Sequence, residues 1–232
     1  MYGCTKDIGI HRAKGHDQSN LRYFMGARKK EALEQFNRDN ILTAAKELFD
    51  VNGIDKTTMD DIARHADYSK STIYVYFKSK EDIFNSIVGE YLEKLGVEIR
   101  QEIDQEQDFE KCYYRFCECL VVFEEKYPRY FSGLTGDVRL NNQKKGQGMI
   151  KHDMGREIRL LIKELIEKGI NGNVLRKDIE LEPTVLYVWS AISGIIQVAG
   201  RKRDYINSRL NMTKEEYLHY SFRMFFDSLV RG

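Results

Sequence analysis

Two prolines in a chain of 232 residues, Pro128 and Pro183, are the feature that most restricts how this sequence can fold. Proline removes a backbone N–H and clashes with the preceding helical turn, so a chain that nearly lacks it can form long helices. Leu, Ile, Glu and Lys recur throughout, and apolar residues return every three or four positions. With 42% hydrophobic and 31% charged residues, we expect a soluble all-α protein.

The charges are distributed unevenly, although the formal net charge is only +1. Seven bases fall in the first 30 residues: Lys6, Arg12, Lys14, Arg22, Arg28, Lys29 and Lys30. Residues 98–125 instead carry nine acids against three bases. Because residues 1–24 show no helical period, we expect a disordered basic arm there. Translation that starts at Met25 is the alternative for this segment.

Other classes of protein and site are disfavoured by motif and spacing. Four cysteines and no secretory signal pattern indicate a reducing compartment, so we expect a cytoplasmic protein. The uncharged run over residues 183–200 contains several polar residues and favours a buried helix over a membrane span. The cysteine spacing matches no zinc motif, and the sequence has no hydrolase elbow, phosphate loop or metalloprotease signature. We therefore expect no metal, no cofactor and no catalysis.

Three helices are predicted over residues 29–78, and two of them are short. The first covers about 29–52 on one apolar stripe and ends at Gly53. Thr58, followed three positions later by an acid, begins a helix of about two turns, and Ser69 is the expected N-cap of the next. Two short helices joined by a tight turn and braced by a longer one form a helix-turn-helix, whose second short helix enters the DNA major groove.

A family resemblance is carried by residues 38–84, which read RDNILTAAKELFDVNGIDKTTMDDIARHADYSKSTIYVYFKSKEDIF. They resemble the N-terminal domain of the tetracycline-repressor (TetR) family of bacterial transcriptional regulators. Asp67 departs from this family pattern in the turn and Ser71 on the groove-facing side, because glycine is common at both positions. The resemblance implies a three-helix DNA-binding domain over 29–78 and a helical ligand-sensing and dimerisation domain over 79–232.

The resemblance also implies which side chains contact DNA. Those expected to hold phosphates are Thr58, Thr72, Tyr76, Lys78 and Lys80, and those expected to approach bases are Ser69, Lys70, Ser71, Tyr74 and Val75. Hydroxyls and lysines reach phosphate oxygens and base acceptors, and a tyrosine adds a flat face for a thymine methyl. Structural alternatives stay open: Thr58, Ser69 and Ser79 as simple caps, Tyr76 packed on the first helix, and Lys80 solvated. Residues 31–84 also carry eleven acids against seven bases, so the bases must be concentrated locally.

The remainder of the chain is expected to dimerise and to bind a small molecule. A helix that is apolar almost all round and the last helix offer two seams for a four-helix interface with a second copy, through Val185, Trp189, Ile192, Ile196, Leu218, Phe222, Phe225 and Phe226. The alternative is that these helices form only intramolecular core. In relatives, the region between lines a ligand cavity, here with candidates Phe109, Tyr113, Phe116, Cys117, Phe123, Tyr130, Met154, Ile158 and Leu161.

These features predict a homodimeric repressor that binds a palindromic operator in double-stranded DNA and is released by a small-molecule effector. We expect the effector to shift the helix that starts at Lys80 and so change the separation of the two recognition helices. One alternative is a DNA-binding regulator or nucleoid-associated factor without a ligand, controlled by a protein partner. Another is a ligand-binding module with a vestigial helix-turn-helix.

Overall fold

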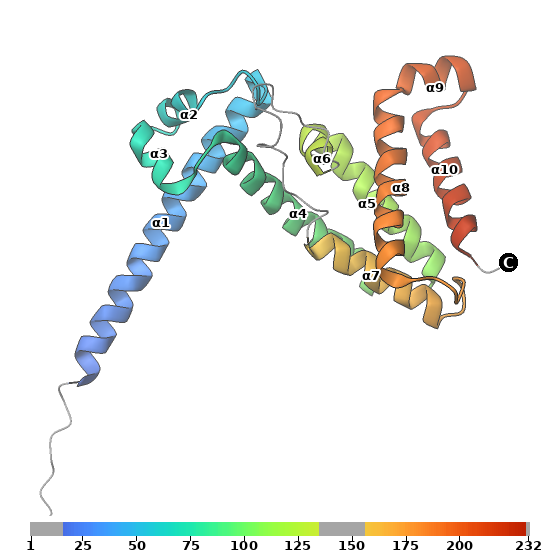
Figure 1. The fold of residues 1–232 in the computed structure, drawn as a ribbon, viewed down its shortest axis with the longest axis horizontal. Helices are drawn as coiled ribbons and strands as arrows, with labels where there is room; N and C mark the ends of the chain where they lie inside the picture. The colour runs from blue at the N-terminus through green and yellow to red at the C-terminus, as the bar shows by residue number, and fades with distance from the viewer. Residues whose placement is uncertain (1–15, 135–155, 231–232) are drawn as a thin grey trace, which may run out of the picture.

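The computed structural model describes the backbone of residues 16–134 and 156–230, and the side chains of these ranges from residue 28 onward. Within them the chain forms ten α-helices and no strand, which confirms the all-α prediction. The helices are α1 (His16–Asn52), α2 (Met59–His65), α3 (Lys70–Tyr76), α4 (Lys80–Asp104), α5 (Phe109–Lys126), α6 (Pro128–Leu134), α7 (Arg156–Asn171), α8 (Leu181–Arg201), α9 (Arg203–Leu210) and α10 (Lys214–Leu229). Helices α1–α3 form one lobe, α5–α10 form another, and α4 runs between them (Figure 1).

Helix α1 begins much earlier than the sequence pattern predicts. It starts at His16, not near Lys29, so residues 16–24 of the expected disordered arm belong to a helix. Residues 1–15 lie outside the described part of the chain. The side chains of residues 28–36 are all exposed, and the helix projects away from both lobes here (Figure 1). No apolar period marks residues 16–24 in the sequence, so the pattern could not reveal this part of the helix.

The short helices start where their capping residues predict. The Thr58 hydroxyl accepts a hydrogen bond from the Asp61 amide at 3.1 Å, and the Asp61 carboxylate accepts one from the Thr58 amide at 3.0 Å. The Thr58 hydroxyl and amide thereby hold the pKa of Asp61 below its ordinary value. Ser69 and Ser79 cap α3 and α4 in the same way, each by accepting from the amide three positions later.

Two positions between these helices adopt the left-handed backbone region. Gly53 follows α1 with φ of 80°, as a residue just past a helix end commonly does. Asp67 has φ of 58° in the turn between α2 and α3, a conformation that glycine adopts with less strain than other residues.

The lobe formed by α1–α3 has a small core that fixes α3. Ile73 and Phe77 point inward from α3 and its C-cap and are 0% and 1% exposed. They join buried side chains of the other helices: Ile41, Ala45, Phe49, Ile62, Ala63, Ile83 and Phe84. Because α3 has only seven residues, this one buried face leaves the rest of its surface outside the core.

In the second lobe, α5 and α8 pack among α4, α7 and α10. The Tyr113 hydroxyl on α5 donates to the Phe222 carbonyl on α10 at 2.8 Å, and burial raises the pKa of Tyr113 and of the neighbouring Cys117. Lys214 at the start of α10 lies 3.2 Å from Glu124 and 3.0 Å from Glu125 at the end of α5. Burial alone would lower the pKa of Lys214, but the two carboxylates outweigh it and raise that pKa.

Helix α8 contains the uncharged run noted in the sequence. Of the described helices, it alone is long and apolar enough to cross a bilayer. Val185, Val188, Ile192 and Ile196 on it are nevertheless buried, and α8 packs against α5, α7 and α10. It serves as a core helix of the second lobe, as the sequence favoured.

Candidate nucleic-acid interface

The outer face of α3 carries most of the side chains expected to approach bases. Tyr74 is 48% exposed and Val75 is 78% exposed, and Ser71 and Lys78 are exposed beside them. Ile73, between these residues, is fully buried and sets the rotation of the helix. The fold therefore holds a tyrosine, a serine and an aliphatic side chain on one surface at the end of the molecule away from α7–α10 (Figure 1).

Hydroxyl groups cluster where α3 begins. The Ser69 hydroxyl lies 2.8 Å from the Ser71 hydroxyl and 2.7 Å from the Thr72 hydroxyl, and it accepts the Thr72 amide at 3.1 Å. Lys70 forms an ion pair with Asp60 of α2 at 2.8 Å, and the hydrogen bond and charge of Asp60 raise the pKa of Lys70. Both partners are exposed, so a phosphate can compete with Asp60 for the ammonium group.

Tyr76 lies on the inner side of this surface. Its hydroxyl accepts a hydrogen bond from the Asn37 side chain of α1 at 2.9 Å, and Arg38 donates to its carbonyl at 3.3 Å. The Arg38 guanidinium also lies over the Phe77 ring, 4.3 Å from its centroid. In the free chain these contacts tie α3 to α1, which is the structural alternative that the sequence left open for Tyr76.

Lys80 has a role that the sequence did not reveal. Its ammonium group donates to the Ile54 carbonyl at 2.6 Å and to the Thr57 carbonyl at 2.9 Å, with a longer contact to the Asp55 carbonyl at 3.4 Å. Lys80 therefore joins the start of α4 to the loop before α2. Its partners lie more than twenty positions away in sequence, so no local pattern could have identified them.

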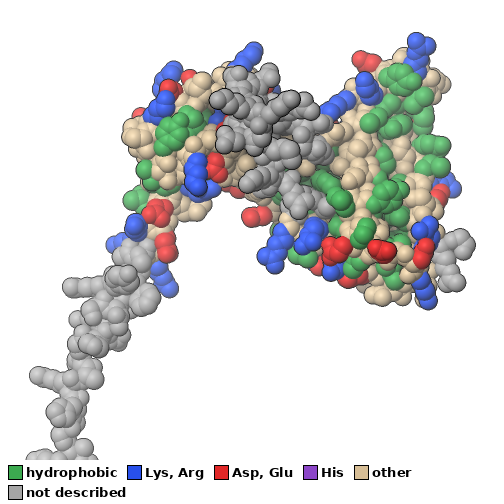
Figure 2. Space-filling model, in the orientation of Figure 1, with side chains coloured by type: hydrophobic (Ala, Val, Ile, Leu, Met, Phe, Trp, Pro, Cys, Tyr) green, Lys and Arg blue, Asp and Glu red, His purple; other side chains and the backbone are tan. Residues whose placement is uncertain are grey.

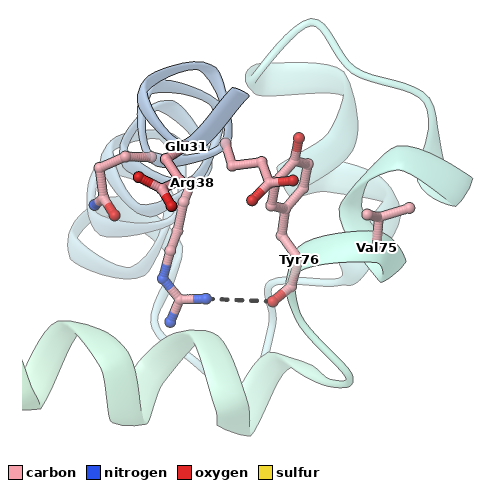
Figure 3. A pocket seen from close by; sticks show the side chains of 6 residues that line it. Glu31, Arg38, Val75 and Tyr76 are labelled. Atoms are coloured by element: carbon pink, nitrogen blue, oxygen red, sulfur yellow. Dashed lines mark hydrogen bonds between the residues drawn. The ribbon is translucent and has the colours of Figure 1, made fainter. Parts of the chain in front are cut away.

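An open groove of about 500 Å³ separates α1 from the end of α3 (Figure 3). It is lined by Glu31, Glu34, Gln35, Arg38, Val75 and Tyr76. The Arg38 guanidinium and the Tyr76 carbonyl form the hydrogen bond drawn across it (Figure 3). No sequence pattern indicates this groove, because it depends on how α1 runs past α3.

The residues expected to line an effector cavity lie in the core of the second lobe. Eight are at most 8% exposed: Phe109, Tyr113, Phe116, Cys117, Phe123, Tyr130, Ile158 and Leu161. Met154, the ninth, lies outside the described residues. Several of their rings pack on one another, as Phe123 does on Phe131 and Tyr127. The Tyr130 hydroxyl is buried and has no hydrogen-bond partner among the described residues.

The residues expected at a dimer interface need a correction. All eight are at most 8% exposed inside the chain's own core: Val185, Trp189, Ile192, Ile196, Leu218, Phe222, Phe225 and Phe226. The same two helices expose a different apolar set, Leu186, Tyr187, Val198, Tyr220 and Met224, each between 44% and 59% exposed. Hydrophobic side chains cover much of the surface over α8–α10 (Figure 2). Because α8 is apolar almost all round, its period could not distinguish the two faces.

Comparison with known proteins connects this surface to a family. Residues 41–87, from within α1 into α4, match the family model described as bacterial regulatory proteins, tetR family. This segment is a TetR-type N-terminal domain. The chain is 29% identical over 139 residues to the uncharacterized HTH-type transcriptional regulator YhgD of Bacillus subtilis, a match covering 59% of this chain and 70% of YhgD.

Another relative is similar over a shorter stretch, with higher identity. The HTH-type transcriptional repressor BepR of Brucella suis is 41% identical over 61 residues, which are 26% of this chain and 28% of BepR. The TetR-family FadR of Thermus thermophilus, solved with lauroyl-CoA, has the same fold with a TM-score of 0.62 and 21% identity. That match covers 84% of this chain and 96% of FadR. The comparisons thus show a TetR-type N-terminal domain and similarity to transcriptional regulators.

Proposed function

We propose that the chain is a repressor that binds a palindromic operator as a homodimer and is released by a small molecule bound in the second lobe. The observation that carries this proposal is the outer face of α3, where Tyr74, Val75 and Ser71 are exposed while Ile73 is buried. A short helix held in this way presents donors and an apolar contact to base edges. The kinship with transcriptional regulators supports the same conclusion and implies a cytoplasmic location.

Homodimerisation follows from the small number of base pairs that one α3 can contact. Two copies must present their α3 helices about one turn of DNA apart, about 34 Å, or a multiple of it. The exposed apolar side chains of α8 and α10 support pairing through these helices, because a second copy would bury them. We expect Leu186→Glu with Met224→Glu to give monomers in sedimentation experiments. A variant with Val97→Glu, an exposed position on α4, is the matched control and should stay dimeric.

The effector part of the proposal is supported by the Tyr130 hydroxyl. A buried hydroxyl without a partner costs about 1–3 kcal/mol, and a ligand that accepts its hydrogen bond would recover part of this. Tyr130 stacks on Phe84 of α4, with ring centroids 5.6 Å apart, and Phe84 lies 6.2 Å from Phe49 of α1. A ligand that moved Tyr130 would therefore press on α4 and change the separation of the two α3 helices.

A second candidate is a DNA-binding regulator, or a nucleoid-associated factor, that has no small-molecule ligand and responds to a protein partner. The observation that favours it is the close packing of the expected cavity residues in the core. Small molecules extracted from the purified protein and added back to an operator-binding titration distinguish the two candidates. Operator affinity that no extracted compound changes would favour the protein-regulated alternative.

The central test measures DNA binding after selection of a duplex from a random library. We expect Tyr74→Ala to weaken binding by about 1–3 kcal/mol and to relax specificity at one position. Lys78→Ala should weaken binding to all sequences and lower the salt slope by about 1. The matched controls, Tyr205→Ala and Lys202→Ala, are exposed positions at α9 and should bind as the wild type does. Equal binding by all four variants would show that α3 is not the helix that contacts the bases.

A further inference from the structure

The helix-turn-helix lobe has few bases available to a polyanion. Five of the seven bases between residues 31 and 84 are engaged inside the chain, namely Arg38, Lys46, Arg64, Lys70 and Lys80. Lys56 and Lys78 are the two whose ammonium groups have no such partner among the described residues. DNA binding at physiological salt depends on many cation–phosphate contacts. Two ammonium groups without a partner, and Lys70 where a phosphate displaces Asp60, leave a shortage in each subunit.

Bases that could fill this shortage lie on the projecting part of α1. Arg28, Lys29 and Lys30 are consecutive and exposed. Arg28 and Lys29 have no ion pair among the described residues, and Lys30 has a loose one with Glu34 at 3.8 Å, in which both side chains are mostly exposed. Figure 2 shows Lys and Arg side chains where the described side chains of this segment begin, with acids beside them.

The groove next to α3 places these bases relative to the reading surface. Residues 31–38 of α1 line one side of the groove, and Val75, which belongs to the exposed face of α3, lines the other (Figure 3). Arg28 lies about 15 Å beyond Arg38 along the helix axis, at 1.5 Å per residue. A duplex seated on the outer face of α3 continues past this edge, since one turn of DNA is about 34 Å long.

We propose that the Arg28–Lys30 turn of α1 is a second DNA-binding element, which contacts phosphates flanking the base pairs read by α3. The inference rests on the proposed operator binding and adds a contact surface to it. The acids Glu31 and Glu34 line the groove and repel a phosphate there, so the backbone meets α1 one turn further out, at the three bases. Each phosphate contact of this kind contributes about 0.9 to the slope of log affinity against log salt.

The experiment compares two triple variants of the full chain that lose the same charge. One is Arg28→Ala, Lys29→Ala, Lys30→Ala. The matched control is Lys177→Ala, Lys202→Ala, Arg209→Ala, all exposed positions in the second lobe. Affinity is measured from 50 to 300 mM salt on the selected operator, with and without about one turn of flanking duplex on each side.

The first variant should bind the flanked operator about tenfold more weakly at low salt, with a salt slope lower by about 0.9 for each phosphate that it no longer binds. On the duplex without flanks, this variant and the wild type should bind alike. The control should match the wild type on both duplexes. A further variant, Glu31→Gln with Glu34→Gln, should bind the flanked duplex more tightly, because it removes the repulsion.

Three results would overturn the inference. In the first, the Arg28–Lys30 variant has the affinity and the salt slope of the wild type. In the second, the control variant loses as much affinity as the Arg28–Lys30 variant. In the third, the Arg28–Lys30 variant loses as much affinity on the duplex without flanks as on the flanked duplex. In each of these the wild type still binds its operator, so the proposed function would stand. A wild type that binds none of the selected duplexes would instead remove the proposed function, and the inference with it. Circular dichroism checks that both triple variants keep the helical fold.

Discussion

Replacement of Lys80 by methionine tests whether this residue stabilises the fold or contacts DNA. Lys80→Met keeps the apolar stem and removes an ammonium group that donates to two carbonyls at 2.6 and 2.9 Å. Hydrogen bonds that involve a charged group contribute about 1.5–3 kcal/mol each, and released carbonyls near the surface regain some bonds to water. We therefore expect a loss of about 2–4 kcal/mol in the free energy of unfolding. For a chain of this size that lowers Tm by roughly 5–15 °C.

The assay is thermal unfolding followed by circular dichroism at one protein concentration, because dimerisation also contributes to apparent stability. Lys78→Met is the matched control, since Lys78 is exposed two positions away. Lys78→Met should leave Tm nearly unchanged and lower the salt slope of operator binding by about 0.9, whereas Lys80→Met should lower Tm and keep the slope. The reverse pattern, a stable Lys80→Met variant with a reduced slope, would show that Lys80 binds a phosphate and would refute this reasoning.

Substitutions at three further positions test the packing of the chain by urea unfolding. Asp67→Gly should leave stability unchanged or raise it by up to about 1 kcal/mol, because φ of 58° disfavours a side chain; Asp67→Val should instead destabilise the protein. Tyr113→Phe should cost about 1–3 kcal/mol, because it leaves the buried Phe222 carbonyl without its 2.8 Å donor; an unchanged midpoint would contradict this. Lys214→Met should cost about 3 kcal/mol, since it leaves Glu124, whose side chain is 14% exposed, without its cation. Because folding raises the pKa of Lys214, its contribution is complete below the unfolded lysine value, about 10.4, and is lost as the pH rises through the folded value. The difference between wild type and variant should therefore narrow above about pH 10.4, and a constant difference would argue against the ion pair.

The parts of the fold that depend on neighbours in sequence could be predicted. Thr58, Ser69 and Ser79 each bond to an amide three positions later, so residue type and spacing were sufficient to place the starts of α2, α3 and α4. The inward direction of Ile73 and Phe77 followed from their spacing of four. The outward face of α3 therefore follows from the order of its residues alone.

The parts that depend on distant contacts could not be predicted. Lys80 reads as an exposed base at the start of a helix, and only the path of the loop before α2 shows that carbonyls surround its ammonium group. Trp189 and Phe222 read as interface residues because α8 and α10 are apolar over wide arcs, and their burial depends on the packing of five helices. The early start of α1 could not be predicted, because residues 16–24 show no apolar period.

The unbroken course of α1 has a mechanical consequence. Its outer part runs about 33 Å from Arg38 to His16 at 1.5 Å per residue, and it shares one rigid axis with the segment buried under α2 and α4. A tilt of the α1–α3 lobe by about 10° would move the His16 end of α1 sideways by roughly 6 Å over that length. A rotation too slight to dislodge α3 by itself would thus be amplified like the motion of a lever arm.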